Sequence, residues 1–150
     1  MSTTTASRLG HAGIDPRGPR VAATLTSVVL ALVLVTPEPV AGVLLALQAV
    51  VFAVGATRGV QHTPYAALFR GVVRPRLAPP AELEDPRPPR FAQGLGLAFA
   101  GSGLALVLLG VTGAGLMLAG LALVAALLNA ALGLCLGCEL YLILRRVTSR

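Results

Sequence analysis

The stretch VAATLTSVVLALVLVTPEPVAGVLLALQAVVFAVGAT, residues 21–57, contains two apolar runs separated by the turn-forming residues 36–39. Neither run contains a charged residue. A helix needs about 20 apolar residues to cross a bilayer core, although about 17 can suffice. We therefore predict one crossing at residues 21–37 and a second at residues 40–57. Prolines at positions 37 and 39 cannot continue a helix interior, which predicts a tight turn between the two crossings.

Two further apolar runs follow, at residues 91–111 and 114–144, and they predict a third and a fourth crossing. Asn129 and Glu139 are the strongly polar residues of the last run. As one continuous helix this run would be roughly 46 Å long, against a bilayer core of about 30 Å. We expect it to extend beyond the membrane, with Cys135 and Cys138 at the interface near its C-terminal end.

The arginines predict the orientation of the chain. All 12 basic residues are arginines, and none lies inside the four apolar runs. They fall in the tail at residues 1–20, in the loop at residues 58–90, and in the tail at residues 145–150. Four crossings place these segments on one side, which the positive-inside rule makes the cytoplasm. The sequence thus predicts an all-α integral protein of the plasma (cytoplasmic) membrane with four transmembrane helices and both termini cytoplasmic.

The composition agrees with a membrane protein. Hydrophobic residues make up 55% of the chain, charged residues 12%, and the mean hydropathy is +0.81. A soluble domain usually carries about 25% charged residues. The net charge of +6 does not indicate nucleic-acid binding, because the arginines flank apolar runs. Arg17 and Arg20 before the first run also resemble a signal peptide, but its removal would leave arginine clusters on opposite sides.

The loop is expected to contain a short amphipathic helix on the inner membrane surface, at residues 64–74. Thr63 is a good N-cap and Pro64 suits the first helical position. The apolar residues follow helical spacing on one face. They are Tyr65, Leu68, Phe69, Val72 and Val73. The proline-rich remainder is interpreted as a stiff connector or as a docking surface over the cysteines.

Cys135-Leu136-Gly137-Cys138-Glu139 is the chemically reactive part of the sequence. Two cysteines three residues apart share a helix face, which suits thiol–disulfide exchange. At the C-terminal end of a long helix, beside Glu139, thiolate formation would be opposed. We expect loop arginines to offset this effect and to bind an anionic sulfur species. The candidates are Arg70, Arg74 and Arg90.

The same cysteines are also compatible with a metal or with simple packing. Zinc normally takes four ligands. One chain would supply four ligands only if the loop reached the cysteines, and these would be Cys135, Cys138, Glu139 and His62. His11 lies in the N-terminal tail. Two chains together would supply four thiolates. We assign no metal site and no cofactor, and packing of small apolar thiols stays open.

Several motifs resemble a known family. They are Thr63-Pro64-Tyr65, Leu68-Phe69-Arg70, Val73-Arg74-Pro75, the stretch EDPRPPRFAQ at residues 84–93, Leu128-Asn129-Ala130 and the cysteine motif. The chain is similar to small bacterial integral membrane proteins known as domain of unknown function 4395. The resemblance implies a polytopic membrane protein and partners such as a thioredoxin-like protein or a sulfurtransferase. It supplies no established activity. It also singles out His62, Arg90, Gln93, Asn129 and Glu139.

We predict thiol–disulfide or persulfide handling at the cytoplasmic membrane face, with Cys135, Cys138 and Glu139 as catalytic residues. His62, Gln93 and Asn129 are expected to be structural polar residues. A non-catalytic membrane subunit or scaffold and a small oligomeric transporter are the alternatives. Homo-oligomerisation, and whether the protein is an enzyme, stay open.

Overall fold

A computed structural model of the chain describes residues 13–149. Most of the expected N-terminal tail, with Arg8 and His11, lies outside the described residues, as does Arg150. The predicted all-α class is confirmed for the described part, where the one strand-like feature is an isolated bridge. The long helices are α1 (Arg17–Val35), α2 (Glu38–Arg58), α4 (Arg87–Leu108) and α5 (Thr112–Leu132), and the shorter α-helices are α3 (Pro64–Leu68) and α6 (Leu136–Thr148).

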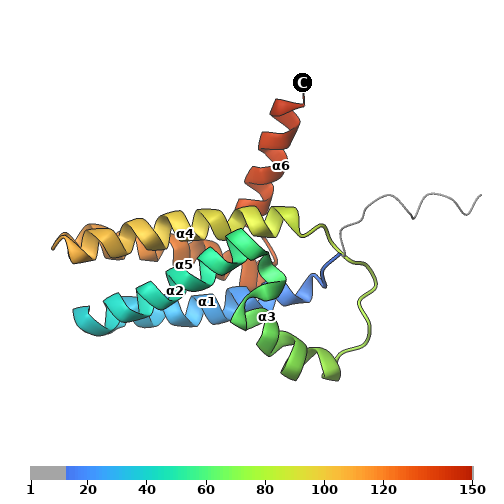
Figure 1. Ribbon diagram of the computed structural model, residues 1–150, viewed down its shortest axis with the longest axis horizontal. Helices are drawn as coiled ribbons and strands as arrows, with labels where there is room; N and C mark the ends of the chain where they lie inside the picture. The colour runs from blue at the N-terminus through green and yellow to red at the C-terminus, as the bar shows by residue number, and fades with distance from the viewer. Residues whose placement is uncertain (1–12, 150) are drawn as a thin grey trace, which may run out of the picture.

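The four long helices form an antiparallel bundle (Figure 1). In this bundle α1 packs on α2 and α5, and α4 packs on the same two helices. Each of the four is long and apolar enough to cross a membrane. The short turns α1–α2 and α4–α5 lie at one end, and the long loop, the start of α1 and α6 lie at the other, here called the loop end (Figure 1).

The bundle is built from two similar halves. The sequence DPRGPR at residues 15–20 begins α1, and DPRPPR at residues 85–90 begins α4. The residues just before these motifs, Ile14 and Glu84, exchange two backbone hydrogen bonds of 2.9 Å in the isolated bridge. Each half then contains two long helices and a short helix, and α3 and α6 project on opposite sides of the loop end (Figure 1). The halves are therefore related by an approximate two-fold axis along the bundle.

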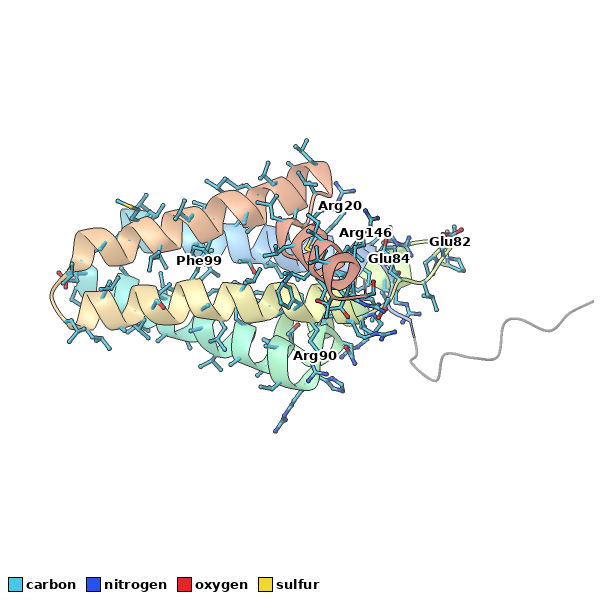
Figure 2. All side chains as sticks on the ribbon, turned by 90° about the horizontal axis from the view of Figure 1, so that it is seen from above. Arg20, Glu82, Glu84, Arg90, Phe99 and Arg146 are labelled. Atoms are coloured by element: carbon cyan, nitrogen blue, oxygen red, sulfur yellow. A yellow bond between two sulfur atoms is a disulfide. The ribbon has the colours of Figure 1, made fainter. Side chains whose placement is uncertain are left out.

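Small residues bring α4 and α5 together away from the loop end. A Cβ atom on Gly115 would lie 2.6 Å from the carbonyl oxygen of Gly103, so neither position has room for a larger residue. Toward the loop end the two helices diverge (Figure 2). Gln48 is fully buried, donates to Thr26 Oγ1 at 3.4 Å and accepts from the Tyr65 hydroxyl at 2.7 Å. The lone amide of this apolar bundle is thus satisfied by hydrogen bonds to α1 and α3.

The continuous helix predicted for residues 114–144 is wrong. Helix α5 ends at Leu132, Gly133 takes a left-handed conformation with φ of 69°, and α6 starts three residues later. The amide of Leu134 donates to the Leu128 carbonyl at 3.2 Å, and that of Gly133 to Asn129 at 3.0 Å, which closes the helix end. Helix α6 then leaves the bundle at a steep angle (Figure 1). Hydropathy alone did not reveal this break, because the turn is as apolar as the helices around it.

The loop helix also differs from the prediction. Thr63 is the N-cap, and its hydroxyl accepts from the Ala66 amide at 3.2 Å as expected. The α-helix stops at Leu68, and one π-helical turn, η2 (Phe69–Val73), and a 3₁₀ turn, η3 (Arg74–Arg76), follow. Phe69 is 4% exposed and faces Gly18 of α1, whereas Leu68 and Val72 are exposed. The single apolar face expected for residues 64–74 is thus divided between the bundle and the outside.

Candidate redox site at the loop end

Cys135 and Cys138 form a disulfide at the loop end. Their Cα atoms are 5.2 Å apart, within the usual range for a disulfide. Inside a regular helix, the Cβ atoms of two residues three positions apart are about 5–6 Å from each other, beyond the usual 3.5–4.5 Å of a disulfide. Cys135 has non-helical backbone angles, φ −87° and ψ 98°, because it is the N-cap of α6. The break between α5 and α6 therefore allows the two sulfurs to come within bonding distance.

The expected position of the cysteines, near the C-terminal end of a long helix, is corrected. They lie at the N-terminus of α6, where the amide of Cys138 donates to the Cys135 sulfur at 3.3 Å. Free amides and the positive end of the helix dipole stabilise negative charge at this end. In the reduced protein they would favour a thiolate at Cys135. Glu139 lies in the first turn and is exposed, so its carboxylate opposes that effect.

Arg20 supports the turn that places the cysteines. Its guanidinium donates to the carbonyls of Ala130 and Ala131, at 3.3 and 3.4 Å, at the C-terminal end of α5. It also approaches Gly133, because a Cβ there would lie 3.8 Å from the Arg20 guanidinium. Carbonyls of the last helical turn have no partner within their helix, and a cation is favourable there. Arg20 was absent from the sequence-based candidates, although its place in the repeated DPRxPR motif could have indicated it.

Helix α6 is anchored on α4. A Cβ on Gly137 would lie 2.6 Å from that of Ala92, so the first turn of α6 packs closely on α4 through a glycine. Further along, the Phe91 and Tyr141 rings are 5.6 Å apart, and the Arg145 guanidinium lies 6.0 Å from the Tyr141 ring centre. These contacts fix the direction of α6 and hold the disulfide against the bundle.

A large cavity of about 1140 Å³ lies where α4 and α5 diverge, and both cysteines line it. Phe99 of α4, labelled in Figure 2 between these helices, belongs to its wall and is 37% exposed. Apolar residues from all four long helices contribute to the same walls, among them Ala23, Phe52, Leu95 and Leu121. The disulfide thus lines, at the loop end, a mainly apolar cavity that enters the bundle.

Three side-chain amides line this cavity, and two of them, Gln93 and Asn129, come from the long helices α4 and α5, whereas the third, Gln61, belongs to the loop. Within the described part of the chain, neither the Gln93 nor the Asn129 side chain makes a hydrogen bond. The backbone carbonyl of Asn129 accepts from the Gly133 amide at the end of α5. Among the described residues, Asn129 makes no side-chain hydrogen bond between helices of the kind that Gln48 makes. The Gln93 side chain packs against Gly55 of α2, and both amides keep donors and acceptors that no described residue uses.

The structure separates the arginines expected to bind an anion. Arg70 and Arg74 line the cavity, and Arg70 also donates to the Gln61 carbonyl at 2.5 Å. Arg90 does not line it, and instead donates to the carbonyls of Ala56 and Thr57 of α2 at 2.7 Å. The charged residues at the rim are of both signs, so the rim is not a simple anion trap. They are Arg20, Arg70 and Arg74 with Asp15, Glu84, Asp85 and Glu139.

The loop and the start of α1 are tied together at the loop end. Arg17 forms an ion pair with Asp15 at 2.8 Å and donates to the Ala78 carbonyl at 2.9 Å. The hydrogen bond from Arg17 holds the pKa of Asp15 below its usual value. At the start of α4, partial burial opposes ionisation of Asp85, but hydrogen bonds from Arg87 outweigh it and lower the pKa of Asp85.

His62 is exposed in the 3₁₀ turn η1 (Val60–His62) and does not line the cavity. It is therefore not brought together with the cysteines. No group of three or more His, Cys, Asp or Glu side chains in residues 13–149 is arranged to hold a metal ion. His11 lies outside the described residues.

The family model described as Domain of unknown function (DUF4395) matches residues 14–146. The match covers nearly the whole described chain, so the protein belongs to this family. No curated protein and no solved structure matches the chain.

Proposed function

We propose that this protein is a membrane thiol–disulfide exchange protein in which Cys135 and Cys138 cycle between disulfide and dithiol. The observation that carries this proposal is the position of the disulfide, at the N-terminus of α6 and in the wall of a cavity. A disulfide that only stabilised a fold would need neither feature. Membership of the family adds no activity of its own.

The chemistry follows from the two environments. In the dithiol form the Cys135 thiolate, at the N-cap, attacks a disulfide of a partner and forms a mixed disulfide. Cys138 then attacks the Cys135 sulfur, which restores the internal disulfide and releases the partner as a dithiol. Two electrons pass from this protein to the partner, and the reverse sequence reduces the internal bond. Both cysteines are half-buried at the loop end, so part of each stays accessible to a partner.

We further propose that the loop end faces the cytoplasm and that the membrane is the plasma membrane. The arginine distribution supports this orientation, since the two turns at the far end of the bundle carry no basic residue. A reporter fused after residue 150 and one inserted at Ala81 should both read cytoplasmic. An external reading at either position would contradict the orientation and leave the thiol chemistry to act on the other side.

The decisive experiment is a trap with Cys138→Ser in the full-length protein. Without the resolving thiol, a mixed disulfide at Cys135 should accumulate and co-purify with its partner, and the reducing agent dithiothreitol should release it. Cys135→Ser is the matched control and should trap less. A thioredoxin-like protein or a sulfurtransferase is the expected class of partner, and an extra sulfur atom on Cys135 would indicate persulfide transfer. If the reduced thiols never react with diamide, a chemical thiol oxidant, the cysteines are packing residues and the scaffold alternative is correct.

A further inference from the structure

We propose that the cavity binds a lipid-soluble quinone, which takes electrons from the reduced Cys135–Cys138 pair. This inference rests on the proposed function, because it names the electron acceptor for the same two cysteines. Formation of a disulfide from two thiols releases two electrons and two protons, so cycling in the oxidising direction requires an acceptor. The surroundings of the sulfurs indicate its chemical class.

The cavity suits an apolar ligand that arrives from the membrane. Its volume of about 1140 Å³ exceeds that of most small-molecule sites, which leaves room for a ring and part of an isoprenoid tail. Leu121 and Val124 of α5 line it and are more than half exposed. The cavity is therefore open along part of its apolar wall, within a helix that is long and apolar enough to cross a membrane. A highly charged soluble cofactor would not be favoured on such walls.

The polar groups in the cavity suit the head of a quinone. Gln93 and Asn129 come from the two helices that diverge to form the cavity, α4 and α5, and their amides make no side-chain hydrogen bond among the described residues. An amide both donates and accepts, so it can bind the carbonyl oxygens of a quinone and the hydroxyls of a quinol. The mixed charges at the rim, by contrast, do not select an anion. These observations favour a neutral ring with oxygen atoms over a phosphate-bearing ligand.

The proposed reaction is balanced. The Cys135 thiolate adds to a ring carbon of the quinone, and Cys138 then attacks the Cys135 sulfur. The sulfur–sulfur bond forms as the sulfur–carbon bond breaks, and the electron pair passes to the ring. Two protons, originally those of the two thiols, end on the ring oxygens. One dithiol and one quinone give one disulfide and one quinol.

The test uses purified full-length protein, reduced, freed of reductant and kept without oxygen. After addition of the short-chain quinone decylubiquinone, one quinone should be consumed for each disulfide formed. Ultraviolet absorbance measures the loss of quinone, and thiol titration measures the loss of free thiols. Ala126→Phe, which places a large ring in the cavity, should slow this oxidation at least about tenfold, because the ring occupies space that the quinone needs. Met117→Phe, which places the same ring at an exposed position of α5 outside the cavity, is the control and should not change the rate.

A second arm separates this inference from the proposed function. Diamide should oxidise the wild-type protein and Ala126→Phe at equal rates, because it does not need the cavity. Oxidation by diamide but not by decylubiquinone would overturn the quinone site and leave thiol exchange intact, whereas failure of both would overturn both. A photoreactive quinone should label peptides of α4 and α5 in the wild-type protein, in competition with decylubiquinone. Labelling that decylubiquinone does not displace would indicate a lipid chain in the cavity and would also overturn the proposal.

Discussion

Arg20 and Arg90 occupy equivalent positions in the two halves of the molecule, and each closes the end of a helix from the other half. Arg20, the last residue of DPRGPR in α1, donates to two carbonyls of α5, and Arg90, the last residue of DPRPPR in α4, donates to two carbonyls of α2. They lie on opposite sides of the loop end (Figure 2). Only the α5 end is followed by the cysteines, so one arginine supports the redox site and the other supports the loop.

This relationship predicts different effects of the same substitution. Arg20→Ala should make the disulfide easier to reduce, by about fivefold in its equilibrium with glutathione, because loss of the carbonyl contacts loosens the turn that holds the two sulfurs together. The measurement is the fraction of free thiol in glutathione buffers of increasing reducing strength. Arg90→Ala is the matched control and should leave this equilibrium unchanged. Equal shifts in the two variants would show that Arg20 acts through general stability of the bundle.

The left-handed turn at Gly133 gives a second prediction. Gly133→Ala should lower the free energy of unfolding by about 1 kcal/mol, because a Cβ atom is disfavoured at positive φ. Thermal unfolding in detergent measures the change. Gly120→Ala is the control in the middle of α5, where a Cβ meets nothing within 4 Å and alanine favours the helix. A Gly133→Ala variant as stable as the wild-type protein would indicate that the turn relaxes without strain.

The bundle could be predicted from the sequence because bilayer crossing imposes a long apolar run, and four such runs are visible. The break at Gly133 could not, because it depends on a left-handed residue and on Arg20, a side chain more than 100 positions earlier. Hydropathy treats residues 114–144 as uniform. The α5–α6 break therefore escaped prediction, and with it the N-terminal position of the cysteines.

The candidate site was predicted in part. Cys135, Cys138 and Glu139 do lie together, and Arg70, Arg74, Gln93 and Asn129 line the same cavity. Arg90 and His62 do not line it, because Arg90 is held by α2 and His62 faces outward. A single sequence gives the spacing of residues along the chain. The cavity arises where two helices diverge, and the distance between helices cannot be obtained from that spacing.

The Asp15–Arg17 ion pair predicts a dependence of stability on pH. Arg17 lowers the pKa of Asp15, so the pair contributes stability that is fully present above the unfolded value of 3.8 and is lost as pH falls through the lower folded value. The nearby cation Arg74 acts in the same direction. On acidification from about pH 6 to about pH 3, the unfolding temperature of the wild-type protein should therefore fall more than that of Asp15→Asn. Parallel falls in the two proteins would place the acid sensitivity elsewhere, with Asp85→Asn as the next variant to compare.

The last prediction concerns the charge beside the sulfurs. Glu139→Gln should raise the rate at which iodoacetamide alkylates the reduced protein at neutral pH, by about threefold, because removal of a carboxylate from the first turn of α6 favours the Cys135 thiolate. The rate is followed by mass spectrometry of Cys135 in a Cys138→Ser background. Glu82→Gln is the control, because Glu82 is an exposed loop residue that does not line the cavity and lies far out on the loop (Figure 2). Since Glu139 is exposed, the difference from wild type should shrink in about 1 M salt, where the Debye length falls to about 3 Å. An unchanged rate in Glu139→Gln at low salt would mean that the free amides of α6, and not this carboxylate, control the reactivity of the pair.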